Sequence, residues 1–242
     1  MPSSMPSAIQ FHDQLARKWS GKYTKRSFTA RASALLSFPN MKDLHGQKWL
    51  DIGCGSGWLS SLLSERGGSV VGVDASYEMI RIASQITSDS HSGSSGSVCA
   101  LLGKAENLPL RANAFDGVLC SSVIEYLSEA ESCLSEINRI LKPSGSLIVS
   151  VPIRFSAIRA LLKVCALVTS KCFRSTWPSY LEYSRLEFSR SEFINIVKAH
   201  NFYPLGFMYF SPILPKIVSC RPFASLMIFS LKKQNTVPEQ NH

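Results

Sequence analysis

Three glycines and two aspartates form the clearest candidate binding pattern in the sequence. The segment LDIGCGSGWLS contains Gly53, Gly55 and Gly57 in alternation, with Asp51 two residues before the first glycine. A second acid, Asp74, closes the apolar run SVVGVD. Glycine turns between a strand and a helix bring backbone N–H groups close to a bound nucleotide, and an acid after the second strand can bind ribose hydroxyls.

The spacing of the glycines discriminates between two nucleotide ligands. The dinucleotide fingerprint G-x-G-x-x-G requires a third glycine at position 58, where this chain has Trp58. A bulky side chain there would obstruct the close helix–strand packing that the third glycine permits. The carboxylate of Asp51 would repel a pyrophosphate but suits an ammonium group. The pattern D-x-G-x-G-x-G therefore favours S-adenosylmethionine over a nicotinamide dinucleotide, although a glycine turn alone also has purely structural uses.

Composition places the chain among ordinary globular proteins. Its 242 residues are 45% hydrophobic and 18% charged, enough for one domain with a sizeable core or one domain with a small cap. The seven cysteines are scattered without a C-x-x-C pair and the five histidines are isolated, so we expect free thiols and no metal. The N-terminal segment MPSSMPSAIQFHDQLARKW lacks an apolar signal core. We expect a cytoplasmic protein; organelle import stays open because this segment is poor in acids.

The net charge of +9 is concentrated in two segments. Residues 14–42 and residues 137–181 each contain seven basic side chains and no acid. Such clustering indicates a site or a surface rather than general solubility. An anionic acceptor or an anionic membrane would suit it.

Strand and helix patterns alternate along most of the chain. Apolar strand-like runs occupy 47–53, 69–76, 98–103, 115–123 and 146–152, and helical patterns occupy 58–66, 77–86 and 128–141. The segment KPSG at 142–145 is expected to end the third of these helices. A further helix over 191–201 and two closing strands over 202–210 and 225–231 follow. This alternation predicts a parallel sheet covered on both faces.

Four motifs in order, LDIGCGSGWLS, VVGVDAS, GKAENLPLRANAFDGVLCSSVIEYL and INRILKPSGSLIVSVP, resemble the class I S-adenosylmethionine-dependent methyltransferases over residues 45–152. The resemblance implies an α/β, Rossmann-like fold: a seven-stranded, mostly parallel sheet with helices on both faces, an antiparallel last strand and a small helical cap. It implies a helical flap over 1–44 and a methyltransferase domain over 45–232. The cap would be inserted at 153–189, and 233–242 would be a disordered tail.

The resemblance also implies roles for residues at the matching positions. Asp51, Gly53, Gly55 and Gly57 would hold the methionine end of S-adenosylmethionine, and Asp74 would bind its ribose. The positions expected near the adenine ring are Ala75, Ser76, Ala105 and Glu106, and those expected near the sulfonium are Ser121 and Ser122. Glu106 as a solvated loop acid, and the two serines as mere strand terminators, remain alternatives.

The layout after residue 152 is similar to the ubiquinone-type O-methyltransferases, which methylate a lipophilic phenol at a membrane surface. We therefore expect O-methylation of a small lipophilic or phenolic acceptor. Glu125 and Tyr126 are the candidates for the base that takes the hydroxyl proton, or for lining the pocket. The ubiquinone-type pattern has His where this chain has Tyr126, which removes its support for a His base or a metal there.

Side chains of the flap and the cap are expected at the acceptor side. Trp19 and Tyr23 of the flap would exclude water, and Arg154 would lie at the mouth. In the segment 153–173, apolar residues at 158, 161, 162, 165 and 168 share one helical face, with Arg159 and Lys163 elsewhere on the cylinder. Such a helix can lie on an anionic membrane, cover an apolar pocket or simply pack on the core, and its apolar run is too short to span a bilayer.

Other acceptors and other classes remain open. Glycan-linked and tetrapyrrole acceptors fit the same fold, as does a basic RNA methyltransferase. The fourth strand, however, is not followed by the N-P-P-Y-like tetrapeptide of enzymes that methylate base amino groups, so nucleic acid is the less favoured partner. A methyltransferase-like binding protein without activity and a nicotinamide-dependent oxidoreductase are the remaining alternatives.

Overall fold

The computed structural model describes residues 8–19, 26–89, 96–173, 181, 183–211 and 223–235. Its helices are α1 (Ala8–Trp19), α2 (Arg26–Leu35), α3 (Trp58–Ser64), α4 (Tyr77–Asp89), α5 (Glu131–Ile140), α6 (Ala157–Phe173) and α7 (Arg190–Ala199), with short 3-10 turns η2 (Pro39–Met41) and η3 (Ile124–Tyr126). The strands are β1 (Lys48–Ile52), β2 (Ser69–Asp74), β3 (Ser97–Leu102), β4 (Phe115–Ser121), β5 (Leu141–Pro152), β6 (Phe202–Phe210) and β7 (Leu226–Lys233).

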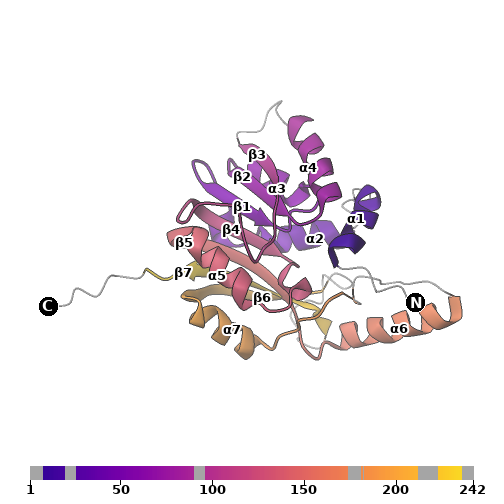
Figure 1. Ribbon diagram of the computed structural model, residues 1–242. Coiled ribbons are helices and arrows are strands. Elements are labelled where there is room, and N and C mark those ends of the chain that lie inside the picture. The colour runs from indigo at the N-terminus through magenta and orange to yellow at the C-terminus, as the bar shows by residue number, and fades with distance from the viewer. Residues whose placement is uncertain are drawn as a thin grey trace.

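The strands form one seven-stranded sheet in the order β3-β2-β1-β4-β5-β7-β6 (Figure 1). Strands β1 to β5 pair in parallel, and β7 is antiparallel to both β5 and β6. The sequence prediction of a Rossmann-like, mostly parallel sheet with an antiparallel last strand is confirmed.

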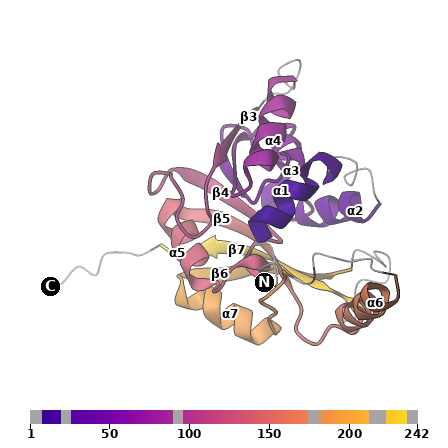
Figure 2. The same ribbon diagram turned by 45° about the vertical axis from the view of Figure 1, so that its right-hand side comes forward.

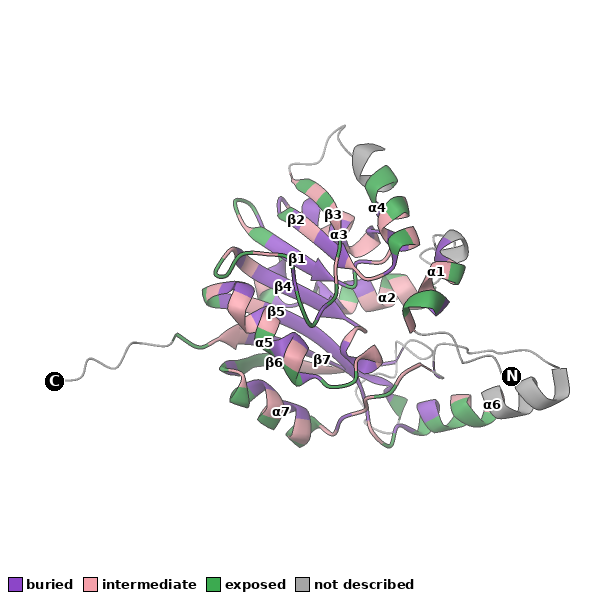
Figure 3. Cartoon of the chain, viewed as in Figure 1, coloured by how far each residue is buried: buried purple, intermediate pink, exposed green. Residues whose placement is uncertain are grey.

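Alternating side chains of the central strands build a core on each face of the sheet. Leu50, Val118 and Phe229 lie in the core under α5 and α7. Trp49 and Leu119, one position out of phase, lie in the core under α2 and α3. The burial follows the strands through the middle of the molecule, while the outer sides of the helices are exposed (Figure 3). This two-sided covering is what the near-continuous apolar strands predict.

The strand order also fixes where a ligand can bind. From β1 the chain continues to β2 and β3 on one side, and then returns to β4 on the other side of β1. The connections after β1 and β4 therefore diverge at the carboxyl ends of these two strands. In open α/β sheets, such a point of reversal is where ligands bind.

Two helices lie near this end of the sheet. Helix α1 packs against α4, and α6 follows β5 and extends away from the sheet, as the two views show (Figures 1 and 2). Helix α7 then begins at a capping box, in which Ser189 and Glu192 each bind the other's backbone N–H. Pairing of β5 with β4 begins at Leu141, opposite Phe115. Helix α5 ends at Ile140, as the segment 142–145 predicts, and the register of β5 against β4 shifts between Leu141 and Ser146.

Candidate functional site

The glycine turn connects β1 to α3 through three residues with left-handed backbone. Gly53, Gly55 and Gly57 have φ of 68°, 55° and 85°. A Cβ at Gly53 would lie 2.2 Å from Cγ2 of Val123, so the turn touches the segment that follows β4. A side chain at Gly53 is excluded both by the backbone and by this contact. The glycine turn after β1 and the segment after β4 are therefore in close contact.

Asp51 lies behind the glycine turn rather than in the cavity. Its side chain is buried on the α3 face of β1, and the hydroxyl of Ser60 donates a 2.7 Å hydrogen bond to it. Burial raises the pKa of Asp51 to about 7, and the charge of Asp74 adds to the effect while the Ser60 hydrogen bond opposes it. Direct contact of Asp51 with a ligand ammonium group was the sequence expectation. In this geometry the carboxyl supports the turn from below.

Asp74, at the end of β2, faces the cavity and is tied to the turn. One carboxylate oxygen accepts a 2.8 Å hydrogen bond from the N–H of Gly55, and the other accepts a 2.9 Å bond from the N–H of Ser76. Burial raises its pKa, although these backbone donors oppose the shift. Each oxygen keeps a second lone pair. Asp74 can therefore accept hydrogen bonds from vicinal hydroxyls, as the sequence predicts.

The turn and Asp74 form part of the wall of a cavity of about 450 Å³, a size typical of small-molecule sites. Of the predicted residues, the lining includes Gly53, Gly55, Asp74, Ala75, Ala105, Glu106, Ser122, Glu125 and Tyr126. Asp51, Gly57 and Ser121 are not among the lining residues. A glycine turn, a carboxylate for ribose and an adjoining slot at 103–106 are what S-adenosylmethionine requires, so the residues present fit this cofactor.

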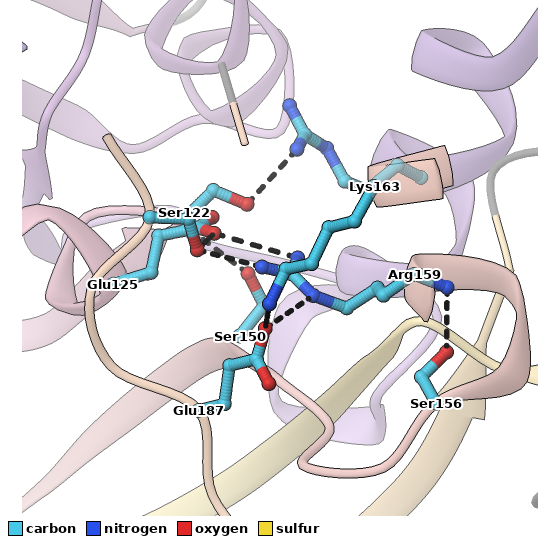
Figure 4. A network of polar contacts seen from close by, with 9 residues as sticks. Ser122, Glu125, Ser150, Ser156, Arg159, Lys163 and Glu187 are labelled. Carbon is cyan, nitrogen blue, oxygen red and sulfur yellow. Dashed lines mark hydrogen bonds and ion pairs between the residues drawn. The ribbon is translucent and has the colours of Figure 1, made fainter. Parts of the chain in front are cut away.

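Glu125 belongs to a buried ionic network at one side of the cavity (Figure 4). Its carboxylate accepts a 2.7 Å hydrogen bond from Ser184 and lies 3.7 Å from Nη1 of Arg159. Arg159 in turn donates to Glu187, which also accepts from Lys163. Burial would raise the pKa of Glu187, but the hydrogen bond from Lys163 and the two nearby cations lower it overall. The network fastens the start of α6 to the segment after β4.

Arg159 corrects the expected orientation of α6. The sequence pattern placed Arg159 away from the apolar face, yet its side chain is buried together with Ile158, while Leu161 and Val164 are exposed. The ion pairs with Glu125 and Glu187 account for this, because a buried guanidinium needs anionic partners. The helix therefore presents a basic residue inward and apolar residues outward at its first turns.

Arg31 and Ser122 form a second polar contact at the cavity wall. Nη1 of Arg31, on α2, donates a 3.0 Å hydrogen bond to the hydroxyl of Ser122. Ser122 has φ of 57°, and its N–H donates to the hydroxyl of Ser150 on β5. Arg31 was not among the predicted site residues, although it belongs to the basic N-terminal segment. The cluster of charge was the available signal, and only the fold shows which residue reaches the site.

Helix α1 closes the cavity from the N-terminal side. Its residues Ala8, Ile9 and His12 contribute to the lining. Asp13 accepts hydrogen bonds from the hydroxyl of Ser76 and the N–H of Glu78, at the start of α4. A carboxylate at this place stabilises the positive end of α4. Asp13 thus anchors α1 next to the residues that follow Asp74.

Of the three residues predicted to form a lid, only Arg154 has a side chain that the structure describes. Trp19 is the last residue of α1, and its side chain lies outside what the structure describes, as does the whole of Tyr23. Arg154 makes 2.8 Å ion-pair contacts with Glu192 of α7 and does not line the cavity. The prediction that Arg154 lies at the acceptor mouth therefore does not match its position. The disordered tail was expected at 233–242, but Lys233 is the last residue of β7, because it extends the pairing with β6. Residues 236–242 lie outside the described residues.

Two features of the described residues bear on metals and membranes. Among these residues, no group of three or more His, Cys, Asp or Glu side chains is arranged so that it could hold a metal ion. Within the same ranges, every helix is too short or too polar to cross a bilayer.

The fold and the cavity define a class I S-adenosylmethionine-binding α/β domain. Residues 50–149 match a protein family described as "Methyltransferase domain". Over this segment, which contains the glycine turn and Asp74, the chain is a methyltransferase domain of the class I S-adenosylmethionine-dependent kind, with S-adenosylmethionine as its cofactor.

Curated relatives match mainly the central part of the chain. The mitochondrial ubiquinone biosynthesis O-methyltransferase of Rattus norvegicus is 38% identical over 112 residues, which are 45% of this chain and 32% of that protein. The demethylmenaquinone methyltransferase of Staphylococcus saprophyticus is 32% identical over 57% of this chain and 60% of that protein. The chain thus spans less than two thirds of the length of these relatives.

Solved structures extend the likeness to nearly the whole chain. A putative methyltransferase from Haloferax volcanii, in complex with the activator Trm112, aligns with a TM-score of 0.70 at 18% identity, over 96% of this chain and all of that one. Magnesium protoporphyrin IX methyltransferase from Synechocystis, with bound SAH, aligns with a TM-score of 0.62 at 18% identity, over 96% and 90%. At these identities the likeness establishes the fold.

Proposed function

We propose that this chain transfers the methyl group of S-adenosylmethionine to a hydroxyl of a small, lipophilic, phenol-like acceptor. The observation that carries the proposal is the single cavity that joins the glycine turn and Asp74 to Tyr126. Several of its walls are apolar, including Ile9, Phe28 and Leu127. Because one cavity extends from the cofactor residues to the apolar wall, the methyl donor and the methyl acceptor can lie side by side in it.

Each part of the wall has a role in this reaction. S-adenosylmethionine, when bound, supplies an electrophilic methyl group. Asp74 binds the ribose, the slot at Ala105 and Glu106 receives the adenine, and the backbone at Gly53 and Gly55 receives the methionine end. The protein then mainly aligns the acceptor oxygen with the methyl carbon and keeps water away. Helix α1 provides the water-excluding cover.

The relatives support the class of acceptor. Two of them are named for ubiquinone biosynthesis and for demethylmenaquinone, which are both quinone-related. The ubiquinone enzymes are named as O-methyltransferases. A phenolic hydroxyl on a lipophilic molecule is the acceptor chemistry consistent with these names and with the apolar wall.

We also propose that the protein binds such an acceptor at a membrane surface. Phe155, Leu161 and Val164, at the start of α6, have exposed fractions of 90%, 62% and 56%. Lys163, between the last two, is also partly exposed. Apolar side chains beside a cation are typical of segments that rest on anionic lipid. Co-sedimentation with vesicles containing anionic lipid, lost in Leu161→Ser/Val164→Ser, would support this; equal binding to neutral vesicles would contradict it.

The test of the proposed function is methyl transfer from labelled S-adenosylmethionine into a cell extract, which is then separated into lipid, polar and RNA fractions. The proposal expects label in the lipid fraction with the natural sequence and none with Asp74→Ala. Label in RNA would instead favour the nucleic-acid alternative. Label in the polar fraction would favour a glycan-linked or other polar acceptor. Absence of label from every fraction would contradict methyl transfer.

A further inference from the structure

One ionisable side chain of the cavity has no counterpart among the sequence motifs. His12, on α1, lines the cavity together with Tyr126. The centres of the two rings are 5.3 Å apart, and their planes meet at 81°, an edge-to-face contact. The neighbouring Phe11 stacks on Tyr183 at 4.5 Å between ring centres. These ring contacts hold α1 so that its imidazole meets the segment after β4.

O-methylation requires a group that takes the hydroxyl proton, and the two sequence candidates suit this task poorly. Glu125 accepts a hydrogen bond from Ser184 and faces Arg159, while its backbone carbonyl accepts from the N–H groups of Arg185 and Leu186. It is thus built into the anchoring of the cap segment. Tyr126 is a phenol, which is protonated near neutral pH and is a better hydrogen-bond donor than base.

Histidine is the residue type best suited to accept a proton near neutral pH. Cys54 also lines the cavity, but burial raises the pKa of its thiol, so it does not serve as a base. The other ionisable groups that line the cavity are Arg31, Asp74, Lys104, Glu106 and Arg159. Three of these are cations, Asp74 is bound to the turn, and Glu106 lies in the slot expected for adenine. His12 also touches the position at which the ubiquinone-type pattern has its histidine. The fold thereby supplies an imidazole to this position from another helix.

We propose that His12 is the general base of the reaction; this rests on the proposed O-methylation. In the transfer step the acceptor oxygen forms a bond to the methyl carbon, and the carbon–sulfur bond breaks with its electron pair left on sulfur. A ring nitrogen of His12 takes the hydroxyl proton. The positive charge of the sulfonium thus ends on the imidazolium, which releases its proton to water. The edge contact with Tyr126 orients the imidazole.

The experiment compares three variants of the full chain in the labelled-methyl assay, using the extract fraction that the natural sequence labels. His12→Gln keeps a polar side chain without a base, and His12→Ala leaves room for added imidazole. His45→Gln is the matched control, since its ring is 65% exposed, binds Asp43 and does not line the cavity. Calorimetric binding of S-adenosylmethionine reports whether each variant is folded with an intact cofactor site.

We expect His12→Gln to lower the transfer rate about 100-fold, the lower end of what a general base contributes. Cofactor affinity should stay within about twofold, because the proton is moved on the acceptor side. The natural sequence should lose rate at acid pH, where the imidazole is protonated, and this loss should be absent in His12→Gln. Added imidazole should restore part of the rate of His12→Ala, and His45→Gln should behave as the natural sequence.

Each other result decides against the assignment. If the natural sequence labels no fraction, the proposed function fails and the role of His12 fails with it. If transfer occurs and His12→Gln has an unchanged rate and pH profile, only the role of His12 is refuted. A slower variant that keeps the acid limb and is not rescued by imidazole would show that His12 merely shapes the cavity.

Discussion

The buried carboxyl of Asp51 should make the stability of the cofactor-free protein depend on pH. Its pKa rises from the ordinary 3.8 to about 7, mainly through burial. The folded chain therefore binds a proton that the unfolded chain has already lost between about pH 4 and pH 7. Stability must fall as the pH rises through this window, since ionisation of Asp51 is unfavourable only in the folded state.

The size of the effect follows from the shift. About three pKa units correspond to about 4 kcal/mol of destabilisation once Asp51 is ionised, and about 3 kcal/mol of this accrues between pH 5 and pH 8. Asp51→Asn cannot ionise, and its amide oxygen can still accept the hydrogen bond from Ser60. Relative to the natural sequence, this variant should gain about 3 kcal/mol of unfolding free energy on going from pH 5 to pH 8.

Urea unfolding followed by circular dichroism at both pH values measures this difference. Asp116→Asn is a control whose effect should not depend on pH in this range. Burial opposes the shift, but the hydrogen bond from Lys142 lowers the pKa of Asp116 overall, so its ionised form is stabilising. Because Asp116 is ionised in both the folded and the unfolded chain at pH 5 and at pH 8, Asp116→Asn should lower the unfolding free energy by the same amount at both pH values. An offset between Asp51→Asn and the natural sequence that is equal at pH 5 and pH 8 would refute the reasoning.

Four further substitutions, one of them a control, test the site and its support. Gly53→Ala should weaken cofactor binding at least tenfold and destabilise the fold by about 2–4 kcal/mol, because a Cβ at φ of 68° would lie 2.2 Å from the Val123 side chain; normal calorimetric binding would contradict this. Asp74→Ala should abolish calorimetric binding of S-adenosylmethionine at micromolar concentration, and retained affinity would remove Asp74 from the ribose site. Arg159→Ala should cost about 3–5 kcal/mol in urea unfolding because it leaves a buried carboxylate unpaired. Arg154→Ala, whose ion-paired side chain is 42% exposed, should cost less than about 1 kcal/mol, and equal losses would refute the distinction.

Much of the fold could be predicted from local sequence. The apolar strand runs, the helical patterns between them and the two closing strands gave the seven-stranded sheet with its antiparallel strand β7. Hydrophobic periodicity carries this information because each strand or helix must bury a face. The end of α5 at Ile140 was also predictable, because proline and glycine at 142–145 stop a helix.

The glycine turn was predictable for a similar reason, and the cavity wall around Tyr126 was not. The turn has left-handed backbone at Gly53, Gly55 and Gly57. Glycine adopts this conformation more readily than other residues, so the glycines in the sequence indicate it directly. The acceptor side is assembled from α1, α2, η3 and α6, which are far apart in the chain. No spacing rule connects such elements, so Arg31 and His12 gave no signal of their own.

The sequence by itself determined the class of the protein, because the motifs for strand, glycine turn and ribose acid are local and each carries its own backbone requirement. Only the tertiary structure decided which side chains share the cavity. It put the Asp51 carboxyl behind the turn, turned Arg159 inward to Glu125, and brought His12 against Tyr126. These outcomes depend on burial and on partners distant in sequence, and those are properties of the packed fold.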